Sequence, residues 1–201
     1  MKDSLRKAGI RILGAIRYDD AMRLQEEAYR NVRDATSPGC IFLLEHDPPV
    51  ITLGRRATSE AFCVSEEIIK KAGYEIHHSS RGGFATVHEP GQAVVYFVLP
   101  VEAKSAKVFV SNILRLAADF LAKTYDIIAQ YDTDRPGLWW NGKKLCACGF
   151  DLTGGVSRHG IAINVSNSLA GFSLIVPCGM MGIEATSVSH ILHRTIECGT
   201  F

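Results

Sequence analysis

The stretch Pro136-Gly-Leu-Trp-Trp-Asn-Gly-Lys-Lys-Leu-Cys-Ala-Cys-Gly149 decides the fold class of this chain. Asn141-Gly142 separates two strand-like runs, and this dipeptide is a preferred centre of a two-residue hairpin turn. The residues from Gly137 to Lys144 also come close to the phosphate-binding motif G-x-x-x-x-G-K-[ST]. However, Lys144 stands where that motif needs a hydroxyl, and the turn signal favours a hairpin over a strand followed by a helix. The stretch therefore predicts antiparallel strands and no phosphate loop.

Further strands and a few helices are expected around this hairpin. Apolar residues at helical spacing predict helices over residues 18–33 and roughly 105–124, and Ser65 and Gly73 are expected to bound a short one. Strand-like runs lie at 40–45, 50–53, 75–79, 93–99, 138–140, 144–152 and 160–165. Residues 168–201 lack a clear period and are expected to be loop with one short helix. Short connections and few helices indicate an α/β (α+β) fold with substantial antiparallel pairing, in one domain over residues 1–201.

Composition and charge argue against several classes of function. With 47% hydrophobic and 21% charged residues in 201, the chain has an ordinary globular composition. Its 22 basic and 21 acidic residues are spread nearly evenly, which argues against nucleic acid or an anionic membrane surface as the main partner. No apolar run approaches the ~20 residues needed to cross a bilayer, and the first residues do not fit a signal peptide. The six cysteines are therefore expected to be reduced thiols in a cytoplasmic protein.

Three further segments carry candidate functional residues. Residues 80–92 place the adjacent glycines Gly82-Gly83 between two strand-like runs, where backbone could turn closely around a ligand. The run Ser157-Arg-His-Gly-Ile-Ala-Ile-Asn-Val165 has small residues at which a ligand could approach. In Ile175-Val-Pro-Cys-Gly-Met-Met-Gly182, Cys178 lies in an expected turn. Cysteines in loops are better candidates for a nucleophile than cysteines packed in a core.

Taken singly, each of these features also fits a structural role. A Gly-Gly pair can be an ordinary turn, a lysine on a strand is commonly solvated, and most cysteines pack inertly. Cys146 and Cys148 share one face of their strand and could ligate a metal ion. No second cysteine pair or spaced histidine pair completes a set of four ligands, so we expect no metal site.

Together, in order and spacing, the four segments resemble the octanoyl-[acyl-carrier-protein]:protein N-octanoyltransferases, the lipoate–protein ligase B family. The resemblance also takes in Ile10-Arg-Ile-Leu-Gly14, Leu24-Gln25, Leu43-Leu-Glu-His-Asp-Pro-Pro-Val-Ile-Thr-Leu-Gly-Arg-Arg56 and Thr186-Ser187, so it covers most of the chain. It implies one catalytic domain of the biotin/lipoate protein ligase type, with a central mixed, largely antiparallel sheet flanked by helices.

The same resemblance implies a reaction and its partners. An octanoyl group would pass from octanoyl-acyl carrier protein, through a cysteine thioester, to a lysine of a lipoyl domain. The expected acceptors are the lipoyl domains of 2-oxoacid dehydrogenases and the glycine cleavage H protein. The reaction would need neither a cofactor nor a metal, because the donor thioester is already activated.

Matched position by position, the resemblance also implies roles for particular residues. Cys178 corresponds to the nucleophile that holds the acyl group, and Lys144 to the partner that lowers the pKa of its thiol. The substrate-binding segments correspond to Arg81, Gly82, Gly83, Phe84, Ala85, Thr86, Val87, His88, Ala147, Cys148, Gly149, Gly160, Ile161 and Ala162. The glycines and alanines among them are small enough to leave room for an acyl chain.

One position departs from the family pattern. Where the family loop usually reads His-Gly-Pro-Gly-Gln, this chain has His88-Glu-Pro-Gly-Gln92. A residue before proline favours extended backbone, which glutamate adopts as readily as glycine. A carboxylate aimed into the site would raise the pKa of Cys178 and compete for Lys144. We therefore expect Glu89 to point outward as a solvated charge, and Glu89→Gly to change transfer less than about fivefold, or about 1 kcal/mol in barrier.

Two other functions remain open from the sequence. An ATP-dependent lipoate or biotin ligase on the same fold would activate a free acid as an acyl-adenylate. The Pro-Cys-Gly segment and the lack of the biotin ligases' Gly-Arg-Gly-Arg loop count against that function. A degenerate, non-catalytic binder of lipoyl domains or acyl carriers is the second alternative, favoured by Glu89 and the short C-terminal segment. For the transferase, the residues expected to receive the acidic face of the carrier are Arg55, Arg56, Lys143 and Arg158.

Overall fold

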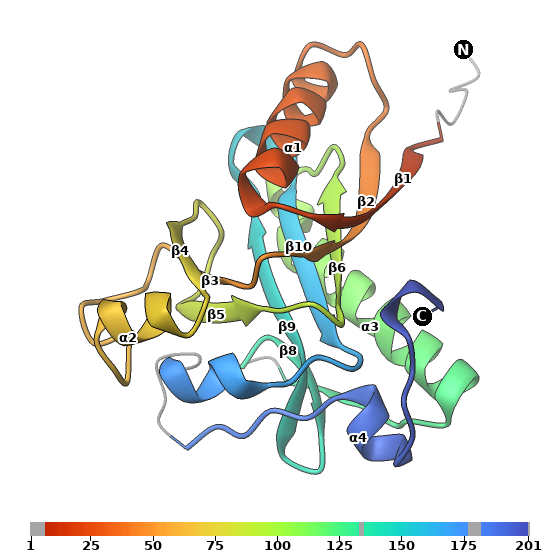
Figure 1. The fold of residues 1–201 in the computed structure, drawn as a ribbon. Helices are drawn as coiled ribbons and strands as arrows, with labels where there is room; N and C mark the ends of the chain where they lie inside the picture. The colour runs from red at the N-terminus through yellow and green to blue at the C-terminus, as the bar shows by residue number, and fades with distance from the viewer. Residues whose placement is uncertain (1–6, 133–134, 177–181, 201) are drawn as a thin grey trace.

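A seven-stranded mixed sheet forms the centre of the protein, with the strand order β1-β2-β6-β10-β9-β8-β7 (Figure 1). The computed structural model describes residues 7–132, 135–176 and 182–200. The strands of this sheet are β1 (Gly9–Ile16), β2 (Cys40–His46), β6 (Gln92–Val98), β7 (Gln130–Tyr131), β8 (Gly137–Trp140), β9 (Lys143–Asp151) and β10 (Arg158–Asn164). The β1–β2 pair is parallel and the other pairs in this sheet are antiparallel. The largely antiparallel sheet expected from the sequence is therefore confirmed.

A second, three-stranded sheet has the order β4-β3-β5. It consists of β3 (Val50–Leu53), β4 (Glu75–His78) and β5 (Ala85–His88), with β3 parallel to β4 and antiparallel to β5. Strand β5 was not expected from the sequence, because its run directly follows the two glycines, which indicate a turn. Its pairing with β3 brings the segment after Gly82-Gly83 into the fold.

The turn between β8 and β9 is the hairpin predicted from Asn141-Gly142. Both residues have positive φ, 48° at Asn141 and 77° at Gly142, which is the conformation of a type I′ turn. The register then places Trp139 opposite Lys144 across the two strands. The phosphate-loop alternative, which needs a helix after the glycines, is thereby excluded for this segment.

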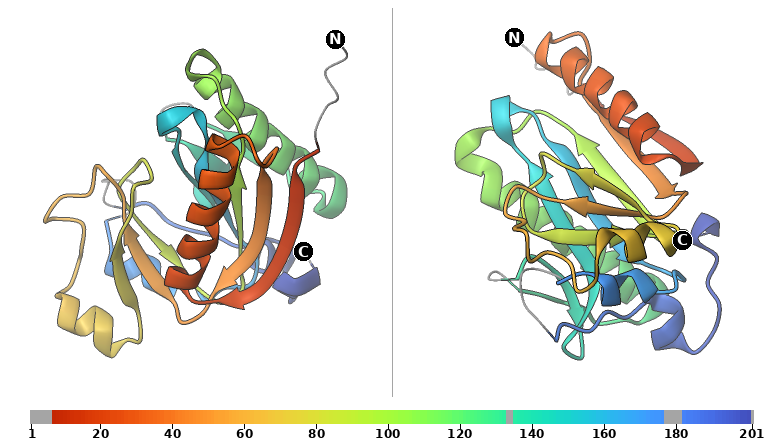
Figure 2. Two further views of the ribbon diagram at one scale, coloured as in Figure 1. Left: turned by 90° about the horizontal axis from the view of Figure 1, so that it is seen from above. Right: turned by 60° about the vertical axis from the view of Figure 1, so that its left-hand side comes forward.

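Helices cover the two faces of the large sheet, as Figure 2 shows. The helices are α1 (Tyr18–Arg33), α2 (Glu66–Lys71), α3 (Ala106–Tyr125) and α4 (Val188–Leu192). Helix α1 packs on the face that carries Val94 and Tyr96 of β6, and α3 packs on the face that carries Ile161 and Ile163 of β10. Successive side chains of a strand point to opposite faces of the sheet. Both faces therefore carry apolar side chains, and a helix covers each face. Among the helices of the described residues, none is long and apolar enough to cross a membrane.

Candidate active site

A pocket of about 650 Å³ opens where the small sheet meets β9 and β10 of the large sheet. Every residue of the predicted substrate-binding set except Val87 lines it, and Lys144 lines it too. Val87 is fully buried and packs with Ile51 and Ile69 in a separate cluster beneath the small sheet. Val87 therefore lies outside the pocket, because β5 turns its side chain toward that cluster.

Gly160 lies where the central strands must approach closely. A Cβ at this position would lie 2.0 Å from the carbonyl oxygen of Val95 on the neighbouring strand β6. Only glycine therefore fits between β6 and β9 at this point of the pocket wall. Gly160 thus allows close strand packing, and both it and Ala162 line the pocket.

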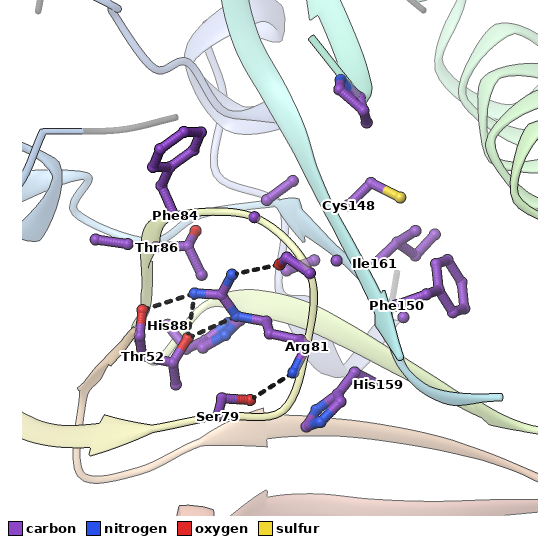
Figure 3. Close-up of a pocket in the computed structure, with 18 of the residues that line it drawn as sticks. Thr52, Ser79, Arg81, Phe84, Thr86, His88, Cys148, Phe150, His159 and Ile161 are labelled. Atoms are coloured by element: carbon purple, nitrogen blue, oxygen red, sulfur yellow. Dashed lines mark hydrogen bonds between the residues drawn. The ribbon is translucent and has the colours of Figure 1, made fainter. Parts of the chain in front are cut away.

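Arg81 is buried in the pocket wall and held by Thr52 (Figure 3). Its Nη2 donates to the Thr52 carbonyl oxygen at 2.6 Å and to Oγ1 at 2.8 Å, and its Nε donates to Oγ1 at 3.0 Å. Its Nη1 donates to the carbonyl oxygen of Gly82 at 3.0 Å. These bonds fix the guanidinium in one orientation, so the pocket carries a positive charge at a defined place.

Lys144 is also buried, with 6% of its surface exposed. Its Nζ lies 5.2 Å from the centre of the Trp139 ring, within the range of a cation–π contact across the hairpin. Its backbone N–H donates to the Glu184 carbonyl oxygen at 2.8 Å, and its carbonyl accepts from Thr186 N at 2.9 Å. The chain that follows residue 182 therefore runs alongside the lysine.

Cys178, the expected nucleophile, lies outside the described residues, which stop at Val176 and resume at Gly182. The two sides of this gap are both held in place. Val176 N donates to the Ala61 carbonyl oxygen at 2.9 Å, and Ala185 forms a parallel bridge with Lys144. The chain before this stretch thus bonds beside the small sheet, and the chain after it pairs with the strand that carries Lys144.

Cys146 and Cys148, the other cysteines of this region, are poor candidates for a nucleophile. Burial raises the pKa of the Cys148 thiol to about 12, although Lys144 opposes the shift. The pKa of Cys146 is raised further by full burial and by Cys148. Both groups therefore stay as thiols at neutral pH. Among the described residues, no cluster of histidine, cysteine or carboxylate side chains could hold a metal ion.

The histidines around the pocket are buried and uncharged at neutral pH. Burial and the neighbouring Arg81 lower the pKa of His159 to about 3. Burial also lowers the pKa of His46, which lies under the pocket, to about 4. His88, a member of the predicted set, has a pKa far below its usual value because of burial and the neighbouring His46. Its Nδ1 lies 2.8 Å from the Gln92 side-chain oxygen. The neutral ring of His88 therefore makes a hydrogen bond there without adding a charge to the pocket.

Several lining residues were not found in the sequence. Among them are Tyr18, Thr52, Tyr96, Val110, Phe150, Leu152 and Phe172, which come from both sheets, a loop, two α-helices and a 3-10 helix. Nothing in their local sequence distinguishes them from core residues, because their direction depends on how distant strands pair. Of these residues, only Thr52 lies in a run, Leu43 to Arg56, that carries the family resemblance.

The basic residues expected to bind the acidic face of the carrier differ in whether they already form a close ion pair with a carboxylate of this chain. Lys143 Nζ lies 2.7 Å from Glu184 Oε2, and Arg158 pairs with Asp151 at 2.7 Å. Arg55 is half-exposed, with its Nη1 3.6 Å from the same aspartate. The Arg56 guanidinium stacks over the Phe84 ring at 4.7 Å, on the pocket wall. Arg55 and Arg56 therefore remain the better candidates of the set.

Glu89 does not point outward, so that expectation is wrong. Only 3% of its surface is exposed. It is also not among the residues that line the pocket, and its carboxylate bonds to neighbouring segments instead. The backbone expectation is confirmed, because Glu89 is not among the residues with positive φ. The small effect expected of Glu89→Gly, which assumed a solvated charge, no longer follows.

Comparison with known proteins identifies the family of this chain. The family model described as the lipoyl protein ligase A/B catalytic domain matches residues 17–201. The chain belongs to this family. The octanoyltransferase of Maridesulfovibrio salexigens is 37% identical to it over 187 residues, which cover 92% of this chain and 86% of that protein. The octanoyltransferase of Alkaliphilus metalliredigens is 35% identical over 187 residues, which cover 92% and 85%.

Within the family, these relatives confirm the resemblance to the octanoyltransferases and make the chain an acyltransferase. A solved structure of lipoate-protein ligase A bound with ATP superposes with a TM-score of 0.75 at 18% identity, covering 96% of this chain and 81% of that one. At that identity the likeness shows the fold alone. The expected fold of the biotin/lipoate ligase type is thereby confirmed.

Proposed function

We propose that this protein transfers an octanoyl group from octanoyl-acyl carrier protein to a lysine of a lipoyl domain, through a thioester on Cys178. The observation that carries the proposal is the buried Lys144 in the wall of a largely apolar pocket, with the chain after Cys178 paired to its backbone. The whole chain, residues 1–201, acts in this proposal as one catalytic domain. The octanoyltransferase relatives support the acyl group.

Lys144 supplies the positive charge that a thiol nucleophile needs. A free cysteine has a pKa near ~8.5, so only a few per cent is thiolate at neutral pH. An ammonium about 4 Å away interacts with a thiolate by up to roughly 4 kcal/mol at an effective dielectric of about 20. Even a third of that energy lowers the thiol pKa by about one unit. The burial of Lys144 supports such a role, because an interaction of this kind is screened less away from water.

The reaction proceeds in two balanced steps. The Cys178 thiolate attacks the thioester carbonyl carbon, the bond from that carbon to the carrier sulfur breaks, and the carrier leaves with the proton that the cysteine gave up. The neutral amine of the lipoyl lysine then attacks the same carbon, the bond to Cys178 breaks, and an amide forms. The proton that the amine loses restores the Cys178 thiol. Lys144 moves the proton in both steps, while the buried Arg81 stabilises the negative charge that develops on the carbonyl oxygen.

The acyl chain supplies binding free energy in the apolar part of the pocket. Burying about seven carbons contributes roughly 5 kcal/mol at about 0.8 kcal/mol per methylene. Side chains such as Phe150, Ile161 and Phe172 provide apolar surface for that contact. The step needs neither ATP nor metal, because the donor is already a thioester.

The acceptors in this proposal are the lipoyl domains of 2-oxoacid dehydrogenases and the glycine cleavage H protein. Arg55 and Arg56, near and on the pocket wall, are the contacts proposed for the acidic face of the carrier. The described cysteines are all free thiols, which suits a reducing compartment, and the proposed location is the cytoplasm.

The proposal is tested by incubating the protein with octanoyl-acyl carrier protein and an isolated lipoyl domain in the absence of ATP. The expected product is the lipoyl domain heavier by one octanoyl group. Transfer that requires free octanoate and ATP would instead identify a ligase. Absence of transfer under both conditions, with the lipoyl domain bound, would identify a binding protein.

A further inference from the structure

Glu89 presents a buried carboxylate that the proposed chemistry does not use. Its Oε1 accepts from Tyr74 Oη at 2.6 Å and from Gly171 N at 2.8 Å. Its Oε2 accepts from Leu169 N at 2.9 Å and from Asn167 Nδ2 at 3.2 Å. Each oxygen therefore has two donors, and three of the four donors belong to one loop, residues 167–171.

The backbone of Glu89 fits the same loop. Gln92 N donates to the Glu89 carbonyl oxygen at 3.0 Å, and Gly91 has a φ of 87°, which together describe a type II turn. The carbonyl oxygen of Gly91 accepts from the backbone N–H groups of residues 165–167. A Cβ at Gly91 would lie 2.7 Å from Asn167 N. Main chain and side chain thus hold the turn against the loop, and the two segments lie side by side in Figure 1.

The loop held by Glu89 leads directly to the pocket. It continues into η3 (Ala170–Leu174), a short 3-10 helix that places Phe172 on the pocket wall. Just beyond η3, Ile175 pairs with Phe62, and Val176 bonds to Ala61. The segment is therefore fixed by Glu89 at its start and by residues 61–62 at its end. Phe172 lies between these two fixed points.

We propose that Glu89 is a positioning residue that sets which acyl chains fit the pocket, an inference that rests on the proposed octanoyl transfer. It acts through the loop: its bonds to Leu169 and Gly171 hold Phe172 in the pocket wall. A wall fixed in this way limits the length of chain that the pocket takes. Glycine at this position, as in the usual family loop, has no side chain to make these bonds.

A carboxylate suits this position because both of its oxygens accept hydrogen bonds, and four donors point at them. Glutamine has the same shape, but in either orientation its NH₂ group would face a backbone N–H of the loop, that of Gly171 or that of Leu169. Glu89→Gln therefore loses at least one hydrogen bond to the loop backbone and loosens the loop. The matched control is Glu67→Gln on the exposed face of α2, which makes the same chemical change away from the loop.

The test measures kcat/KM for octanoyl- and for dodecanoyl-acyl carrier protein, with the thermal midpoint measured in parallel. We expect Glu89→Gln to reduce the preference for octanoyl over dodecanoyl at least fivefold, and Glu67→Gln to keep the parent ratio. A Glu89→Gln protein with a lower midpoint and an unchanged ratio would overturn the proposal, since Glu89 would then be only structural.

Two further arms keep the outcomes separate. If Glu89→Gln does not fold, Tyr74→Phe removes one donor only, and we expect at least a twofold loss of preference; an unchanged ratio overturns the inference. A parent protein that transfers octanoyl, with variants of unchanged ratio, leaves the proposed function standing and removes this inference alone. A parent protein that transfers no acyl group overturns both.

Discussion

Lys144 and Ala185 are paired as parallel backbone neighbours, with Lys144 bonded on either side to Glu184 and Thr186. This pairing brings the segment after residue 182 to the strand that carries the lysine. Lys144 is therefore hydrogen-bonded to a segment, residues 184–186, that follows Cys178, its proposed partner, in the sequence.

The first prediction concerns this pair. Lys144→Ala should raise the pKa of the Cys178 thiol by about one unit and slow its alkylation by iodoacetamide about tenfold at neutral pH. The pH profile of the alkylation rate measures the shift. Lys143→Ala is the control, because Lys143 is half-exposed and paired with Glu184. Identical profiles for Lys144→Ala and the parent would mean that the two side chains are not coupled.

The second prediction concerns the support of Arg81. Thr52→Val keeps the shape of the strand residue and removes the hydroxyl oxygen that accepts from Arg81 Nε and Nη2. Hydrogen bonds to a buried charged group each contribute about 1.5–3 kcal/mol, so loss of the acceptor of two of them should lower the free energy of unfolding by at least the contribution of one. Urea unfolding measures it, with the exposed Thr195→Val as control. A loss below 0.5 kcal/mol, taken as about the size of an ordinary surface effect, would show that Thr52 does not hold the guanidinium.

The third prediction concerns acid stability. The pKa of His46 is lowered to about 4 by burial, against an ordinary value near 6.5, so the unfolded chain binds its proton first as the pH falls. The free energy of unfolding should therefore decrease between pH 6.5 and pH 4, by about 1 kcal/mol per pH unit for this one group.

Denaturant unfolding across that range checks the slope. His46→Gln should reduce it by about 1 kcal/mol per pH unit, since the titrating group is gone. The same change at the exposed His78 should leave the slope as it is in the parent. A slope that His46→Gln does not alter would contradict the assignment of a neutral, buried His46.

Local patterns were sufficient to predict most of the fold. The helical spacing over residues 18–33 coincides with α1, and Asn141-Gly142 marked the hairpin because its turn type depends on those two residues alone. Strand β5 escaped prediction because its run follows two glycines that indicate a turn, and its partner β3 lies more than thirty residues earlier. Local preference cannot report such distant pairing.

The sequence predicted the site residues that lie in recognisable motifs, and it did not predict those that reach the pocket through tertiary packing. The glycines and Arg81 were visible in sequence, whereas Thr52 and Phe172 reach the pocket only through the pairing of the small sheet and the course of η3. The surroundings of Glu89 could not be foreseen either. A glutamate is predicted to be exposed to solvent unless its hydrogen-bond donors are known. Here the donors come from a tyrosine and a loop that are distant in sequence.

In the proposed reaction Cys178 carries the acyl group, and the intact mass of the protein after incubation with octanoyl-acyl carrier protein reports that thioester. We expect an adduct of one octanoyl group that hydroxylamine removes. The adduct should be absent in Cys178→Ser and retained in Cys148→Ser, since burial raises the pKa of the Cys148 thiol to about 12. An adduct that persists in Cys178→Ser, or one that disappears in Cys148→Ser alone, would contradict the account.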